Sequence, residues 1–270
     1  LNPNWKIILW TTKAPELSQA EWIDPKENIK SDFVKYNKTH KEQSVDYVGK
    51  NFFEQACDTA TEVKYVDGII QEKLHPVHNA DLARIQALHD FGGLWSDFDV
   101  LYLKPVNDIK IEDANIDLAF TSSSINLKNS GHYSLNKDPS TIYNIRNHFS
   151  IGLILTSPES PFFRKLLQHI FKKGVDLQRY QSIGVELFHL YTLELLKLNY
   201  YNIPMDHFYP IYHTHLYLLY SHKTELPKDN IGIHWYNGNH LSGEYRNRLT
   251  ESNINQLPDS TMTEAIKKIL

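Results

Sequence analysis

Cysteine is almost absent from this chain, because Cys57 is its only cysteine among 270 residues. A single cysteine excludes an intramolecular disulfide framework. No apolar run approaches the ~18–20 residues that span a bilayer. Lys and Arg together number 28 against 32 Asp and Glu, which leaves a formal charge of −4. Without an excess of basic residues to neutralise phosphates, a nucleic-acid binder is disfavoured. No internal repeat is visible at a period of roughly 20–50 residues, which excludes solenoids and propellers.

Aromatic residues are abundant, at 12% of the chain with 16 Tyr and 5 Trp. Tyr and Trp combine a flat apolar face with a polar tip, which suits the binding of bases and sugars, although many such residues only fill a core. Apolar residues make up 41% and charged residues 22%, which are ordinary values for a globular protein. The length allows one large or two small domains.

Short apolar runs alternate with amphipathic segments along most of the chain. Strands are predicted at 5–10, 62–66, 94–103, 116–120, 151–157 and 231–236, and helices at 27–38, 50–58, 79–91, 157–174 and 183–199. Such alternation predicts an α/β protein with an open, mostly parallel central sheet flanked by helices.

The best-signalled helix is the segment 79–91. Its apolar residues recur at three-residue spacing, Asn79 is a plausible N-cap, and Gly92 and Gly93 follow its end. Glycine accepts the left-handed conformation that commonly ends a helix. Asp81 and Arg84 are three residues apart, so they share one face of this helix.

Two acids, Asp97 and Asp99, follow the glycine pair within the predicted strand 94–103. Side chains alternate along a strand, so both carboxylates are expected on one face. Two adjacent buried carboxylates require a cation or protons, and their hard oxygens suit Mg²⁺ or Mn²⁺. A solvated loop with two harmless acids is the alternative for a bare Asp-x-Asp.

The surrounding pattern is more specific than the two acids alone. The segment 80–106, "ADLARIQALHDFGGLWSDFDVLYLKPV", combines these residues in one block: Asp81, Arg84, Leu88, Gly92, Gly93, Trp95, Asp97 and Asp99. It resembles the sugar-binding region of DXD-type glycosyltransferases with the GT-A (Rossmann-like) fold. That group includes yeast α-1,6-mannosyltransferases, lactosylceramide α-1,4-galactosyltransferases and clostridial glucosylating toxins. Weaker similarities lie at 6–12, 150–167, 207–211 and 234–240. The family often has Asn in the strand near 150, where this chain has Ser150, Ile151 and Gly152.

The resemblance implies roles for the four charged residues of the block. Asp99 would coordinate a divalent cation directly. Asp97 would contact the donor ribose or sugar and help to hold the metal. Arg84 would bind the donor sugar or a phosphate oxygen with its planar fork. Asp81 would accept hydrogen bonds from donor sugar hydroxyls and orient Arg84.

Three further residues receive roles from the same resemblance. Trp10 would stack on the nucleotide base, with core packing as the alternative. His234 would be a metal or phosphate ligand, and its imidazole suits Mn²⁺ better than Mg²⁺. Trp235 would donate its indole N–H to the β-phosphate.

The resemblance predicts a metal-dependent glycosyltransferase, a hexosyl- or pentosyltransferase. It would use a nucleotide-sugar donor such as a UDP-sugar and retain the anomeric configuration. The acceptor would be a hydroxyl of a glycan or lipid-linked oligosaccharide. One domain is expected over 1–270, with a nucleotide-sugar-binding half (1–120) and an acceptor-binding half (121–270). Another Mg²⁺- or Mn²⁺-dependent nucleotide-using transferase and a non-catalytic sugar-binding protein are the alternatives. The lack of paired cysteines favours a soluble cytoplasmic protein; a Golgi-lumenal domain separated from its anchor would look similar.

Overall fold

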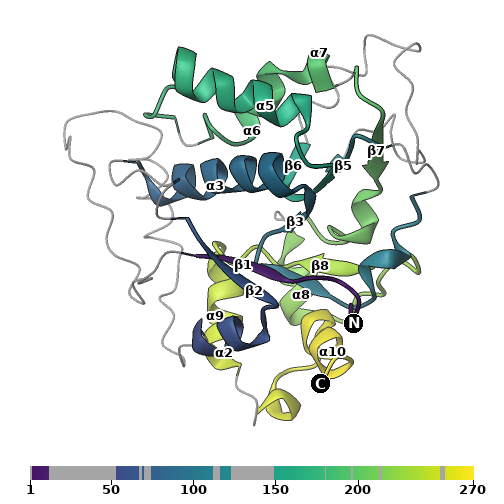
Figure 1. Cartoon of the computed structure of the whole chain (residues 1–270). Coiled ribbons are helices and arrows are strands. Elements are labelled where there is room, and N and C mark those ends of the chain that lie inside the picture. The colour runs from purple at the N-terminus through teal and green to yellow at the C-terminus, as the bar shows by residue number, and fades with distance from the viewer. Residues whose placement is uncertain are drawn as a thin grey trace.

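The computed structural model (Figure 1) gives the arrangement of most of the chain. It describes residues 2–11, 53–66, 69, 74–111, 116–122, 149–179, 181–195, 197–212, 215–249 and 253–270. The helix predicted at 27–38 lies outside these residues. None of the described helices is both long and apolar enough to cross a bilayer.

The largest sheet has four strands in the order β3 (Gly93–Ser96), β6 (Phe149–Thr156), β5 (Leu118–Ser122) and β7 (Tyr200–Ile203). β6 runs antiparallel to both of its neighbours, whereas β5 and β7 are parallel. Leu118, Phe120 and Ile154 are fully buried, because helices cover the sheet. The sheet joins strands from the first 120 residues to strands from the rest of the chain.

Two pairs of strands lie beside this sheet (Figure 1). β1 (Ile8–Thr11) and β2 (Glu62–Tyr65) are parallel, and β4 (Val100–Tyr102) and β8 (Gly232–His234) are antiparallel. The predicted α/β class is therefore confirmed, and the mixture of helices, sheets and parallel pairs fits a GT-A-like fold.

Strand direction differs from the expected mostly parallel sheet, because β3–β6, β5–β6 and β4–β8 are antiparallel. The physical reason is that these partners are distant in sequence. The apolar pattern of a buried strand is the same for either direction, so pattern alone does not determine which way a distant partner runs.

Most predicted elements exist, with shifted ends. The described helices are α2 (Phe53–Thr59), α3 (Pro76–Phe91), α5 (Pro161–Gln168), α6 (Val185–Leu190), α7 (Thr192–Leu195), α8 (Tyr217–Ser221), α9 (His240–Arg248) and α10 (Thr261–Lys267). The predicted helix 157–174 corresponds to α5 and a following π turn, and 183–199 is divided between α6 and α7. β7, α8, α9 and α10 were not predicted.

The helix α3 begins three residues earlier than predicted. His75 caps its start, because the His75 Nδ1 atom accepts a hydrogen bond from the N–H of Val77 at 3.2 Å. Pro76 occupies the first helical position, where its fixed φ and missing N–H are tolerated. The predicted N-cap Asn79 is therefore inside the helix. The predicted end is confirmed, since Gly92 follows the last turn with φ 60°.

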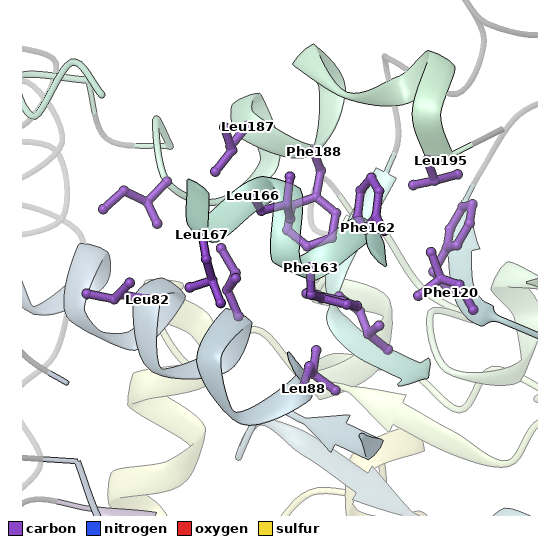
Figure 2. Packing of buried hydrophobic residues seen from close by; sticks show 14 of the residues in the cluster. Leu82, Leu88, Phe120, Phe162, Phe163, Leu166, Leu167, Leu187, Phe188 and Leu195 are labelled. Carbon is purple, nitrogen blue, oxygen red and sulfur yellow. The ribbon is translucent and has the colours of Figure 1, made fainter. Parts of the chain in front are cut away.

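α3 packs against α5 through an apolar face, and side chains of α6 join the same buried cluster (Figure 2). Leu82 and Leu88 of α3 belong to the same buried cluster as Phe163 of α5, as Figure 2 shows. Phe163 also meets Phe188 of α6 edge-on, with ring centroids 5.9 Å apart. This packing fixes α3, and therefore its buried residues Asp81 and Arg84, relative to the sheet.

Candidate active site

Asp97 and Asp99 lie in a turn rather than within a strand. β3 ends at Ser96 and β4 begins at Val100, whose N–H bonds to the carbonyl oxygen of Asp97 at 3.3 Å. Phe98, between the two acids, is 81% exposed. The predicted continuous strand 94–103 is therefore wrong, and so is the expectation that both carboxylates share a strand face. Aspartate is favoured in turns because its short side chain satisfies nearby backbone groups.

Asp97 joins a buried network with α3. Arg84 donates from Nη1 to Oδ1 of Asp81 at 2.5 Å and from Nη2 to Oδ1 of Asp97 at 2.9 Å. The same Asp97 oxygen accepts a hydrogen bond from the indole Nε1 of Trp95 at 2.7 Å. Arg84 and Asp81 are each only 6% exposed. The planar guanidinium thus links helix α3 to the turn, as its fork geometry allows.

Two carboxylates share one guanidinium in this network. The pKa of Asp81 is raised to about 6, chiefly by burial; Arg84 opposes this shift and the charge of Asp97 adds to it. Burial would lower the pKa of Arg84, but Asp97 and Asp81 outweigh it and the pKa lies above its usual value. Arg84 is therefore a permanent buried cation beside the turn.

Asp99 faces the opposite direction, toward β8. Its Oδ1 atom lies 3.1 Å from Nε2 of His234, and its Oδ2 atom accepts a hydrogen bond from the N–H of Asn237 at 3.1 Å. The register of β4 and β8 pairs Val100 with His234, which brings the preceding Asp99 alongside this histidine. Burial would raise the pKa of Asp99, but His234 lowers it below its usual range.

The Asp99–His234 pair can provide two ligands for a divalent cation. Among the residues that the structure describes, no three His, Cys, Asp or Glu side chains converge as a metal cage. A cation bound with a diphosphate does not need such a cage, because phosphate oxygens and water complete its coordination. A carboxylate and an imidazole fit Mn²⁺ better than Mg²⁺. Asp97 as a further ligand stays a prediction, since its Oδ1 is engaged by Arg84 and Trp95.

The two predicted tryptophan contacts have different surroundings. Trp10 lies on β1, and its ring centroid is 5.4 Å from that of Phe91 at the end of α3. Trp235 follows β8, and its backbone N–H donates to the carbonyl oxygen of Asp99 at 2.9 Å. Its side chain packs on an apolar cluster. Base stacking by Trp10 and phosphate binding by the indole of Trp235 stay predictions.

Two glycines from the second part of the chain lie against these acids, and neither contact was predicted from the sequence. A Cβ atom added at Gly152 would lie 3.0 Å from Oδ2 of Asp97, and one added at Gly184 would lie 2.5 Å from Oδ2 of Asp81. Neither glycine has positive φ, so no turn signal marks either one. Trp95, another contact of Asp97, was visible only as the aromatic of the motif.

Comparison with known families supports the pattern found in the sequence. Residues 1–116 match the family model described as the glycosyltransferase sugar-binding region containing the DXD motif. The matched segment includes the Arg84 network and both acids of the turn, and it ends before His234 and Trp235. The chain matches no curated protein.

Proposed function

We propose that this protein, whose residues 1–116 match the model of the glycosyltransferase sugar-binding region containing the DXD motif, is a metal-dependent glycosyltransferase with a nucleotide-sugar donor, a UDP-sugar in the first instance. One observation carries the proposal. The turn at 97–99 directs one acid to a buried guanidinium and the other to an imidazole, at the C-terminal end of a strand where α/β sheets bind ligands.

The donor sugar would be bound on the Asp97 side of the turn. Asp81 and Asp97 offer carboxylate oxygens to sugar hydroxyls, and Arg84 holds both carboxylates in place. Charge-assisted hydrogen bonds of this kind are stronger than neutral ones, so they can orient the anomeric carbon. Trp10 would contribute base stacking on the edge formed by β1.

The diphosphate would be bound on the Asp99 side. Asp99 and His234 would hold Mn²⁺ or Mg²⁺, which supplies electrostatic stabilisation to the departing nucleoside diphosphate. Trp235 would add a hydrogen-bond donor for the β-phosphate. These residues fit a cation whose remaining ligands come from the substrate.

Transfer would proceed on one face of the sugar, with retention. The bond between the anomeric carbon and the phosphate oxygen breaks, and the acceptor oxygen forms the new bond on the same face. The acceptor proton passes to the leaving phosphate, so no enzyme nucleophile is required. The acceptor hydroxyl would belong to a glycan or lipid-linked oligosaccharide.

The proposal treats 1–270 as one domain with a shared site. The donor acids come from the half 1–120, whereas His234 and Trp235 come from the half 121–270, which would also bind the acceptor. The sheet supports this arrangement, since β6 of the second half pairs with β3 of the first half and with β5, which spans the boundary between the halves.

A thermal-shift panel of nucleoside diphosphates and their sugars, each with Mn²⁺ or EDTA, tests the donor site. Ligand at 100 times its Kd stabilises the fold by about 2.7 kcal/mol, which is readily measured. A Mn²⁺-dependent shift with one nucleotide, absent in Asp99→Asn and present in the exposed control Asp108→Asn, is the expected result. No shift with any nucleotide would contradict the proposal.

Product analysis then separates the remaining candidates. Transfer of the sugar to an acceptor, or its slow hydrolysis, supports a glycosyltransferase. Transfer of a phosphoryl or nucleotidyl group would indicate another metal-dependent nucleotide transferase. Nucleotide-sugar binding with neither reaction, across a broad acceptor set, would indicate a non-catalytic sugar-binding protein.

A further inference from the structure

The imidazole of His234 lies between two tyrosine rings. The ring of Tyr209 is stacked on it, with centroids 4.9 Å apart and an interplanar angle of 24°. The ring of Tyr236 meets it edge-on, with centroids 4.2 Å apart and an angle of 72°. The His234 backbone is also fixed, since its N–H donates to the carbonyl oxygen of Phe208 at 2.7 Å. The side chain is therefore confined on two sides while its Nε2 faces Asp99.

Tyr209 is itself held firmly and reaches toward the other acid of the turn. It is only 5% exposed, and its hydroxyl forms a hydrogen bond of 2.5 Å with Oγ of Ser150 on β6. A Cβ atom added at Gly152 would lie 3.1 Å from this hydroxyl and 3.0 Å from Oδ2 of Asp97. The ring of Tyr209 thus contacts the Asp99 side of the site while its hydroxyl lies near the Asp97 side.

Tyr236 has a backbone conformation that is unfavourable for its size. Its φ is 50°, in the left-handed region that bulky residues rarely adopt. The same turn directs the N–H of the next residue, Asn237, to Oδ2 of Asp99. Strained backbone of this kind persists where the surroundings enforce it, and it clusters at ligand sites. Among the described residues, Glu159 at φ 58° is the other non-glycine residue with positive φ.

We propose that Tyr209 and Tyr236 are positioning residues that clamp the His234 imidazole against Asp99, so that this pair is preformed for the cation and diphosphate of the donor. The inference rests on the proposed function. Confining both ligands before binding removes the entropy cost of ordering them during binding. Outer partners of metal ligands commonly contribute 10- to 100-fold to metal affinity, and the clamp should contribute in that range.

The first test compares variants that remove or keep each ring. Tyr236→Gly suits the left-handed conformation but deletes the ring, whereas Tyr236→Phe keeps the ring. Tyr209→Leu removes the stacked ring and Tyr209→Phe keeps it. Glu159→Gly is the matched control, because it relieves the same backbone conformation on an exposed turn before α5.

The measurement is the Kd of Mn²⁺ in the presence of UDP, or of the nucleoside diphosphate that gives the Mn²⁺-dependent thermal shift. Tyr236→Gly and Tyr209→Leu should weaken Mn²⁺ binding about tenfold or more, while both Phe variants and Glu159→Gly stay near wild type. Urea unfolding shows whether each variant is folded. If Tyr236→Gly is not folded, Tyr236→Leu takes its place. Mn²⁺ affinities of the ring-deleted variants within twofold of wild type would overturn the clamp.

A second measurement needs neither metal nor nucleotide. Modification of His234 by diethyl pyrocarbonate, followed by peptide mass spectrometry, reports how freely the imidazole moves from its present position, where its side chain is 11% exposed. Ring deletion should speed modification several-fold. If wild type binds no Mn²⁺ with any nucleotide but ring deletion speeds modification, the proposed function fails while the clamp stands. An unchanged modification rate in folded ring-deleted variants overturns the clamp by itself.

Discussion

Asp97 and Asp99 are separated by one residue but lie in different environments. Asp97 accepts hydrogen bonds from Arg84 and Trp95, close to the buried carboxylate of Asp81. Asp99 faces an imidazole and a backbone N–H contributed by β8 and the residues after it. The turn makes this division possible, because neighbouring acids on a strand face would compete for the same partner. A short acidic motif can therefore place its two carboxylates in two distinct environments.

The pKa values of the carboxylates also shift in opposite directions on the two sides of the turn. Burial raises the pKa of Asp81 to about 6, whereas His234 outweighs burial and lowers the pKa of Asp99. The Arg84 side thus carries two carboxylates for one cation, while the Asp99 side favours an ionised carboxylate. Under the proposed function, the sugar hydroxyls would bind on the first side and the divalent cation on the second.

The largest effect is expected on the Asp99 side. Asp99→Asn removes one charge from the proposed cation site, and activity should fall roughly a thousandfold, or several kcal/mol of transition-state stabilisation. Steady-state kinetics over a range of Mn²⁺ concentrations measures the loss, with Asp108→Asn as control. Wild-type activity in Asp99→Asn, or in excess chelator, would remove the cation from the mechanism.

The next effect belongs to the Asp97 side. Arg84→Lys keeps the charge but cannot bond Asp81 and Asp97 with one planar fork, so kcat/KM should fall about 10- to 100-fold. The Mn²⁺ affinity should change far less, because Arg84 is not on the Asp99 side. Arg164→Lys, on the exposed face of α5, is the matched control. A loss of Mn²⁺ affinity equal to the loss of kcat/KM would break the division between the two sides.

The opposite pKa shifts predict opposite pH dependences of stability. A raised pKa means that Asp81 binds its proton more tightly when folded, so its contribution is fully present below about pH 4 and is lost as the pH rises through about 6. The shift corresponds to about 2–3 kcal/mol. Asp99, with a lowered pKa, contributes stability above its usual pKa that is lost as the pH falls. In urea unfolding from pH 3 to 7, Asp81→Asn should therefore remove the loss of unfolding free energy between about pH 4 and pH 6. Asp99→Asn should reduce the loss of unfolding free energy at the acid end of this range. If the free energy of unfolding still falls between about pH 4 and pH 6 in Asp81→Asn, a group other than Asp81 is responsible.

The contact between α6 and the Arg84 side gives a stability test. Gly184→Ala places a Cβ atom 2.5 Å from Oδ2 of Asp81, so something must shift, at a cost of about 1–3 kcal/mol. The free energy of unfolding should fall by less when Asp81→Ala is already present. A double-mutant cycle measures this coupling, and strict additivity would show that the two residues do not interact.

The smallest effect is expected at the edge formed by β1. Trp10→Ala should weaken nucleotide binding by about 1–3 kcal/mol if the ring stacks on the base, whereas Trp10→Phe should keep most of the affinity. Calorimetric titration of the nucleotide measures both variants. An unchanged nucleotide Kd, with reduced thermal stability, would assign Trp10 to packing on Phe91 alone.

Local signals explain what the sequence could predict. The apolar stripe of α3, its glycine end and the short apolar strands are patterns within a few residues, so the helix and most strands were located correctly. The motif from Asp81 to Asp99 is also contiguous, which is why its resemblance to a known family was recognisable. The N-terminal end of α3 was placed late because the cap is a histidine, a residue less common in that role than Asn.

By itself, therefore, the sequence determined the α/β class, the helix that carries Asp81 and Arg84, and the acidic motif that follows it. Only the tertiary structure decided the antiparallel pairing of β6, the separate directions of Asp97 and Asp99, and the approach of Gly152, Gly184 and Tyr209 to the site. Most of these features depend on contacts between residues that are distant in sequence, such as Asp97 with Gly152, Asp81 with Gly184 and Asp99 with His234. The chain records such contacts only through shape and burial, which no short window of sequence contains.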